Sequence, residues 1–195
     1  ALERGNMKVQ IGLLLILLFT SISCTTRKEP LGSAENPVKL HFVPSVEAKV
    51  LKDNSKKFQQ YLEKVTPYKY KVTIPQSYIA VVEAFGTKRA DVAALNSFGY
   101  VLAHERFGAE ARLTVLRHGS ASYQSQFIAH VDSGIEKIED LDGRAVAFVD
   151  ASSMSGYKLP LKTLTDRKIR PKETVFAMKH DSVVTMIYQK QVDAG

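Results

Sequence analysis

The sequence predicts an α/β protein built from two successive sets of strands and helices, each set forming a mostly parallel sheet flanked by helices. Apolar segments of strand length alternate with segments whose apolar residues recur at helical spacing, and strands separated by helices pair in parallel. Between the two sets, at His118–Ser122, the composition turns small and polar, so we expect a hinge there. The chain has 195 residues, 45% of them hydrophobic, which is enough to bury a sizeable core.

The beginning of the chain predicts an export signal that precedes the folded part. Ile11–Phe19 is an apolar block with Lys8 before it and small residues after it, and it is too short to span a bilayer as a helix. Residues 1–24 therefore fit a secretory signal peptide. Met7 is a candidate initiator, which would make residues 1–6 upstream sequence.

Cys24 is the single cysteine of the chain and follows the apolar block closely. A single cysteine cannot form an internal disulfide, so its presence needs another explanation. Its position resembles a bacterial lipobox, in which the cysteine is lipidated and becomes the mature N-terminus, although Ser21 stands where Leu is typical. Residues 25–36 are polar and predict a flexible tether between the membrane and the folded domain.

The first set of elements, predicted over residues 37–121, has the order of a parallel α/β sheet. Its strands are predicted at Pro37–Val43, Tyr68–Ile74, Ala90–Leu95 and Arg112–Leu116. Its helices are predicted at Lys49–Val65, at Ser77–Thr87 with Ile79, Val82 and Phe85 on one side, and from Asn96 onward.

The second set, predicted over residues 122–195, repeats this alternation. Its strands are predicted at Gln126–Val131, Ala145–Val149 and Thr174–Met178, with the beginning of another at Gln191–Gly195. Its helices are predicted at Ile135–Leu141, from Tyr157 to about Arg167, and from His180 onward.

The turn after the predicted strand Ala145–Val149 carries the most informative chemistry of the chain. Ser152, Ser153, Ser155 and Gly156 lie where this strand gives way to a helix. The first N–H groups of a helix have no intrahelical partner, hydroxyls add donors beside them, and glycine permits close approach. Such a turn suits a small oxyanion such as phosphate or phosphonate. Taken alone, the same pattern is also typical of a helix N-cap with a polar lead-in.

The formal net charge is +7, with Lys and Arg scattered among acidic residues. Because there is no run of basic residues and no interleaved basic and aromatic patch, the charge does not predict nucleic-acid binding and fits anionic ligands better. Four histidines show no metal-ligand spacing, so we expect no metal and no cofactor. They are His41, His104, His118 and His130.

Several segments, taken in order, carry a resemblance to a known family. They are Arg89–Tyr100, Gly119–Ser125, Asp132–Ile135, Asp140–Asp150, Ser152–Pro160, His180–Asp181 and Val192–Gly195. Together they resemble the periplasmic phosphate/phosphite/phosphonate-binding proteins of ABC transporters, over roughly Pro37 to the end. Met154 stands where this family often has Thr, which removes one hydroxyl donor.

The resemblance implies a type II periplasmic-binding-protein fold, with two α/β lobes joined by a hinge and the ligand in the cleft between them. Members of the family are longer, so by this comparison the chain is a C-terminally truncated protein with an incomplete second lobe. The implied partners are the permease subunits of an ABC importer and a membrane reached through the lipid anchor, and the protein is expected to be a monomer.

Six further residues join the three serines and Gly156 as candidate ligand contacts. The resemblance places a ligand-contacting histidine at His180. Asp181 is typical of an N-cap, and near a ligand it would accept a proton or orient His180. The others are Tyr123 as a hydroxyl donor or a packed hinge aromatic, Tyr100 as a donor or a core residue, and Asn96 and Ser97 at the end of a parallel strand.

The predicted function is capture of a small phosphorus oxyanion by a lipid-anchored binding protein outside the cytoplasmic membrane, without covalent chemistry. One alternative is a sensory domain that binds the same ligand and signals to a partner. Another is a hydrolase with a serine nucleophile, which the sequence disfavours because Ser152–Gly156 is not a Gly-x-Ser-x-Gly elbow and no base with an orienting partner stands out.

Replacing Cys24 by Ser removes the thiol that would carry the lipid. We expect the Cys24→Ser variant to leave the membrane fraction and appear in the soluble extract, because the tether would then hold no acyl chain. Immunoblotting of fractionated cells measures this, and continued membrane association of the variant would rule out the lipid anchor.

Overall fold

The computed structural model describes residues 29–195, and these residues contain two parallel sheets flanked by helices, as predicted. The predicted signal peptide over residues 1–24, Cys24 and the first part of the predicted tether lie outside the described residues. Within the part of the chain that is described, no helix is long and apolar enough to cross a membrane.

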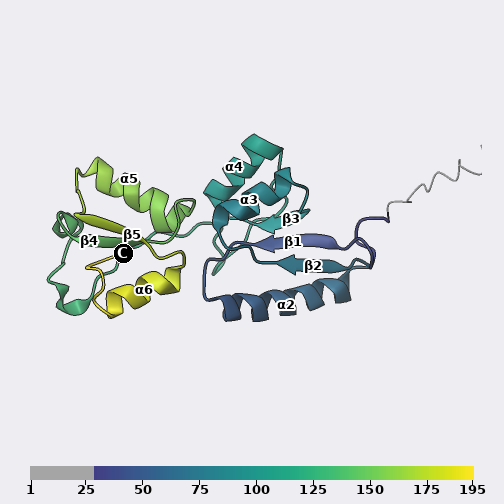
Figure 1. The fold of residues 1–195 in the computed structure, drawn as a ribbon, viewed down its shortest axis with the longest axis horizontal. Helices are drawn as coiled ribbons and strands as arrows, with labels where there is room; N and C mark the ends of the chain where they lie inside the picture. The colour runs from purple at the N-terminus through teal and green to yellow at the C-terminus, as the bar shows by residue number, and fades with distance from the viewer. Residues whose placement is uncertain (1–28) are drawn as a thin grey trace, which may run out of the picture. The chain divides into compact units, whose positions relative to one another are not determined.

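The first sheet has three parallel strands in the order β2-β1-β3, so β3 lies at one edge. They are β1 (Val38–Phe42), β2 (Tyr70–Thr73) and β3 (Val92–Ala94). Its helices are α2 (Ala48–Val65), α3 (Tyr78–Gly86) and α4 (Ser97–Phe107). Figure 1 shows α2 on one side of the strands and α3 with α4 on the other, the arrangement that helical crossovers between parallel strands produce.

Helix α3 buries Val82 of the predicted face but exposes Ile79, because the buried face is rotated toward Tyr78 and Val81. Ser77 caps it by accepting a hydrogen bond from the Ala80 N–H, and the first helical residue, Tyr78, is only 3% exposed. Val81 and Val82 are fully buried, whereas Ile79 is 37% exposed. Tyr78, Val81 and Val82 also satisfy helical spacing, so periodicity alone could not distinguish the two faces.

The second sheet pairs β4 (Ala145–Phe148) with β5 (Glu173–Phe176) in parallel. Every residue of β4 is buried, which explains its continuous apolar sequence. Successive side chains of a strand point to opposite faces. Ala145 and Ala147 therefore enter one apolar cluster, whereas Val146 and Phe148 enter the other.

Helices cover both faces of this second sheet. A π-helical turn, η3 (Met154–Lys158), continues directly into α5 (Leu159–Asp166), and α6 (His180–Tyr188) packs on the opposite face (Figure 1). The predicted helix at Ile135–Leu141 is only the 3-10 helix η2 (Ile138–Leu141), which follows another 3-10 helix, η1 (Val131–Ser133).

Two of the predicted strands do not form. Arg112–Leu116 has no strand partner in the described part of the chain, and Leu113 and Val115 are 95% and 72% exposed. Gln126–Val131 contributes only an isolated bridge between Ala129 and Ala194. Alternating side chains specify a strand only where a neighbouring edge accepts its backbone hydrogen bonds, and the sequence pattern contains no information about that edge.

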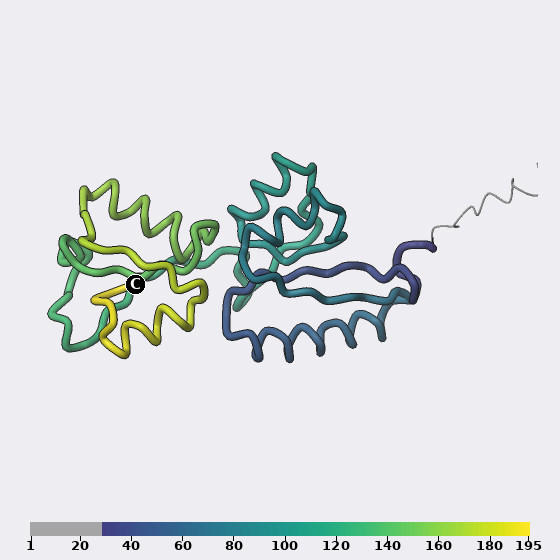
Figure 2. The backbone as a smooth tube through the Cα atoms, in the orientation of Figure 1, coloured from purple at the N-terminus to yellow at the C-terminus, as the bar shows by residue number. Residues whose placement is uncertain are grey.

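The predicted strand at Gln191–Gly195 is reduced to bridges at its end. Ala194 bridges both Ala129 and Val146 of β4. Gly195 exchanges two backbone hydrogen bonds with Ile128, at 2.8 and 3.0 Å, so the end of the chain lies beside residues 128–129 (Figure 2).

The described end of the predicted tether makes backbone hydrogen bonds to the first set of elements. The Gly32 N–H donates to the Asn36 carbonyl at 2.7 Å, and the Lys69 N–H donates to the Gly32 carbonyl at 2.8 Å. Gly32 has a φ of 93°, and a Cβ on it would lie 2.5 Å from the ring of Tyr68. Residues 31–36 therefore form a turn that rests on the loop before β2.

His41 gives the first sheet a pH-sensitive position. It lies on β1, is 5% exposed, and its Nδ1 has no hydrogen-bond partner among the described residues. Burial lowers its pKa from 6.5, with Lys39 acting in the same direction and Asp91 opposing it. As pH falls, the unfolded chain therefore protonates this histidine at a higher pH than the folded protein does. The stability due to neutral His41 is lost as pH falls below 6.5.

We therefore expect the free energy of unfolding of the wild type to decrease more between about pH 7.5 and 5.5 than that of the His41→Val variant. Urea unfolding at the two pH values measures this difference. Equal losses in the two proteins would show that His41 does not carry the effect.

Candidate ligand-binding site

The residues that follow β4 form a compact turn, residues 150–156, which we call the serine turn. Asp150 is 7% exposed, and its carboxylate accepts the Ser152 N–H at 2.7 Å. Its carbonyl accepts the Ser153 N–H at 2.8 Å. An aspartate that binds the backbone two residues ahead stabilises a turn, so Asp150 fixes where the serines begin.

Ser153 is the N-cap of η3. Its Oγ accepts a hydrogen bond from the Gly156 N–H at 3.1 Å, and the residue is 1% exposed. The cap satisfies one of the N–H groups at the start of the helix, which the sequence analysis expected to be available to a ligand. The hydroxyl proton of Ser153 is a further donor, so the residue is able both to cap the helix and to donate to an acceptor.

Gly156 is needed for packing within the protein, which differs from the role in ligand approach that the sequence predicted. A Cβ at this position would lie 2.4 Å from Cγ2 of Val149 and 2.6 Å from its Cβ. Any side chain would thus push the serine turn away from the end of β4. The glycine permits the turn to fold back over the strand.

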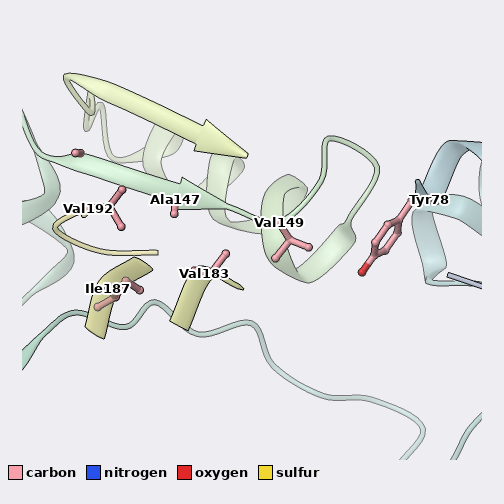
Figure 3. Packing of buried hydrophobic residues seen from close by; sticks show 7 residues of the cluster. Tyr78, Ala147, Val149, Val183, Ile187 and Val192 are labelled. Carbon is pink, nitrogen blue, oxygen red and sulfur yellow. The ribbon is translucent and has the colours of Figure 1, made fainter. Parts of the chain in front are cut away.

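Tyr78, which sequence reasoning missed, brings α3 to the serine turn. It belongs to the same apolar cluster as Val149, and Figure 3 shows its ring reaching toward the coil that follows β4. Its hydroxyl lies near the hydroxyls of Ser153 and Ser45. A signal was present in the sequence, because Ser77 and Tyr78 open a helix just after a parallel strand, the edge at which ligands of such sheets bind.

The Tyr78 hydroxyl stays protonated over the ordinary pH range. Burial raises its pKa from 10.0 to about 12, and the nearby Asp150 charge adds to the shift, while the hydroxyls of Ser153 and Ser45 oppose it. Tyr78 is therefore a neutral hydrogen-bond donor at the serine turn.

His180, the first residue of α6, is joined to Ser45. Its backbone N–H donates to the Ser45 carbonyl at 3.1 Å. Burial lowers the pKa of its imidazole from 6.5, Asp181 opposes this shift, and Arg117 adds to it. A neutral imidazole presents one N–H donor and one acceptor.

Asp181 is not the N-cap that its sequence position suggested, since Lys179 occupies that position without a side-chain bond. It lies instead in the first turn of α6, where its carboxylate accepts the Ser182 N–H at 3.0 Å and faces the positive end of the helix dipole.

Asn96 contacts the serine turn, and both ends of its amide form a hydrogen bond within the protein. Its Oδ1 caps α4 by accepting the Gly99 N–H at 2.6 Å, and its Nδ2 donates to the Ser152 carbonyl at 3.0 Å. Asn96 is thereby a positioning residue for the turn. Ser97 is an exposed residue at the start of α4, and Tyr100 is half-buried with its ring 5.8 Å from that of His104 on the same helix.

Tyr123 lies at the exposed side of the serine turn. Its hydroxyl donates to Ser155 Oγ at 3.4 Å, and the residue is 63% exposed, so it is not a packed hinge aromatic. The guanidinium of Arg117 lies 5.7 Å from its ring centroid. Ser125 adds a hydrogen bond from its hydroxyl to the Ser155 carbonyl, which holds residues 123–125 against the turn.

The serine turn gathers neutral hydroxyl groups. The hydroxyls of Ser153, Ser155, Tyr78 and Tyr123 lie around this one turn. No group of three or more His, Cys, Asp or Glu in residues 29–195 could hold a metal ion. An open cavity of about 200 Å³ lies elsewhere in the second set, beside Ile135, Ile138 and Leu141.

Comparison with known proteins finds a family model and relatives that match the chain. A family model described as the periplasmic phosphonate substrate-binding protein of ABC transporters matches residues 40–195. The phosphate-import protein PhnD of Mycolicibacterium smegmatis is 26% identical over 212 residues, which cover 98% of this chain and 65% of that protein. A shorter match, 36% identical over 76 residues, relates 36% of the chain to 13% of the tetrathionate sensor histidine kinase TtrS of Salmonella typhimurium.

Solved structures share the fold. The binding-protein component of an ABC phosphonate transporter from Pseudomonas aeruginosa gives a TM-score of 0.73 at 20% identity, over 86% of this chain and 56% of that chain. PhnD1 from Prochlorococcus marinus, solved with methylphosphonate, gives 0.62 at 21% identity, over 81% of this chain and 62% of that chain. These likenesses confirm the predicted type II binding-protein fold, of which the chain spans about two thirds or less.

Replacing Tyr78 by Phe keeps the ring and removes the buried hydroxyl. In absorbance titrations of phenolate, we expect the wild type to show one tyrosine ionising near pH 12 that is missing from Tyr78→Phe, because burial disfavours the charged form. The raised pKa also means that the stability due to this hydroxyl is lost only as pH rises from 10 toward about 12.

Tyr188→Phe, at a residue that is 77% exposed, is the matched control and should leave the component near pH 12 in place. Loss of that component in the control but not in Tyr78→Phe would overturn the assignment.

Proposed function

The chain belongs to the family of periplasmic phosphonate-binding proteins of ABC transporters, and from this premise we propose that it captures a small phosphorus oxyanion for import. Phosphonate, phosphite and phosphate are the candidate ligands. Members of the family are substrate-binding transport proteins rather than enzymes, and binding by hydrogen bonds needs no nucleophile.

The observation that carries the proposal is the gathering of neutral donors around the serine turn. Ser153 and Tyr78 are 1% and 3% exposed, so an oxygen of the ligand that reaches them leaves water behind. Hydrogen bonds from neutral groups to a charged acceptor are strong in such surroundings. Asp150 begins the turn and contributes no donor. Its carboxylate already accepts the Ser152 N–H, which makes it a poor ligand for a cation.

The proposed mechanism is capture between two lobes, residues 37–121 and 122–195, that close on the ligand through the hinge near residues 118–122. Tyr78 and Asn96 come from the first of these lobes, and the serine turn and His180 come from the second. The closed form would dock as a monomer on the permease subunits of an importer, and Cys24 would anchor the protein to the outer face of the cytoplasmic membrane.

A sensory role is the second candidate. The similarity to the tetrathionate sensor kinase over 76 residues supports it, because a domain of this fold can pass ligand binding to a signalling partner. The two candidates share the ligand site and differ in the partner that the closed form contacts.

Isothermal titration calorimetry of the full chain with phosphate, phosphite and methylphosphonate tests the proposal. We expect one of these anions to bind, and Ser153→Ala to weaken that binding at least about tenfold, or about 1.4 kcal/mol, because a charged acceptor loses a donor. Circular dichroism should accompany the titration, since loss of the cap also costs about 1 kcal/mol of stability.

Ser133→Ala is the matched control, because the Ser133 hydroxyl makes a similar turn bond, accepting the Ile135 N–H at 3.2 Å, but lies outside the serine turn. Its affinity should equal that of the wild type. Absence of heat with all three anions, together with binding of an amine or a carboxylate, would reject the proposed function.

A further inference from the structure

Arg117 is a cation that the oxyanion site does not use. Among residues 29–195 it forms no ion pair with a carboxylate, although nine other pairs between basic and acidic side chains are present. An exposed arginine commonly has freedom to move, so its position needs a structural cause.

The backbone and an aromatic ring both position this side chain. Arg117 and Ser120 exchange backbone hydrogen bonds at 2.8 and 2.9 Å, around a tight turn in which His118 and Gly119 have φ values of 49° and 78°. The guanidinium then lies 5.7 Å from the ring centroid of Tyr123. Stacking of this kind favours a defined position at an exposed site.

Tyr123 connects Arg117 to the site, because its hydroxyl donates to Ser155 Oγ at 3.4 Å. Together with burial, the charge of Arg117 also lowers the pKa of His180. The positive charge of Arg117 therefore lies beside the serine turn, on the side of Ser155 rather than of Ser153.

Burial gives the bound ligand a direction. Ser153 is 1% exposed and Tyr78 is 3% exposed, whereas Tyr123 is 63% exposed. If the oxyanion takes the buried donors, the organic substituent of a phosphonate points toward the exposed side, where Tyr123 and Arg117 lie. A substituent at that place meets a flat aromatic surface and a fixed positive charge.

We propose that Arg117 determines which organic substituent the protein accepts, favouring phosphonates with an anionic substituent and disfavouring those with an ammonium group. This inference rests on the proposed function. Two like charges near each other in partly desolvated surroundings repel, while opposite charges attract. The carboxylate that could act in the opposite sense is Asp181, which faces the N-terminus of α6 and accepts the Ser182 N–H.

The test compares three probes by titration calorimetry of the full chain: methylphosphonate, phosphonoacetate and 2-aminoethylphosphonate. The wild type should bind phosphonoacetate about fivefold or more tightly than 2-aminoethylphosphonate, and Arg117→Gln should bring this ratio to about one. Arg117→Lys keeps the charge and should keep most of the preference. In 1 M salt the wild-type ratio should decrease and the Arg117→Gln ratio should not change, because screening acts only on the charge.

Arg112→Gln is the matched control, since Arg112 is exposed in the same segment but pairs with Glu110, and its ratio should equal that of the wild type. Failure of the wild type to bind phosphate, phosphite and all three phosphonate probes would refute the proposed function itself, whereas binding of phosphate or phosphite without any of the phosphonates would overturn only the inference about Arg117. If methylphosphonate binds but the ratio is the same in wild type and Arg117→Gln, the inference about Arg117 is wrong. A preference for 2-aminoethylphosphonate that Asp181→Asn abolishes would also overturn it.

Discussion

The close contact between Gly156 and Val149 is the constraint on which the candidate site depends. Because no side chain fits there, the turn folds back over the end of β4 and brings the Gly156 N–H within 3.1 Å of Ser153 Oγ. This hydrogen bond starts the π-helical turn and buries Ser153. Packing therefore positions the turn, and a larger residue at position 156 would clash with Val149 and crowd the hydroxyl of Ser153.

Strand β4 transmits this constraint to both faces of its sheet. Its alternate residues enter two different apolar clusters, one that includes Val183 and Ile187 of α6 and one that includes Leu164 of α5. The serine turn is consequently attached to the best-buried strand in the second sheet, and His180 begins the helix that packs on one of its faces. Donors held by a rigid support lose little conformational entropy when they bind, which favours affinity.

The parts that sequence reasoning predicted are those in which a residue pattern and its local partner coincide. The buried strand at Ala145–Val149, the polar turn after it and the helix from His180 each depend on contacts within a few residues or on a continuous apolar run. Arg112–Leu116 was predicted wrongly because alternation cannot reveal whether a neighbouring strand is present to pair with it. The role of Tyr78 was missed because its face of α3 and the face of Ile79 satisfy the same helical spacing. The choice between them depends on what packs against the helix, which is a property of the tertiary fold.

The hydrogen bond from Asn96 Nδ2 to the Ser152 carbonyl connects two parts of the candidate site that are far apart in the sequence. It joins the start of α4 to a turn 56 residues further along the chain, and a typical bond of this kind contributes about 1 kcal/mol net. A bond of this strength shifts the equilibrium between arrangements with and without the contact only about fivefold. This single bond is therefore too weak by itself to keep the start of α4 and the serine turn together.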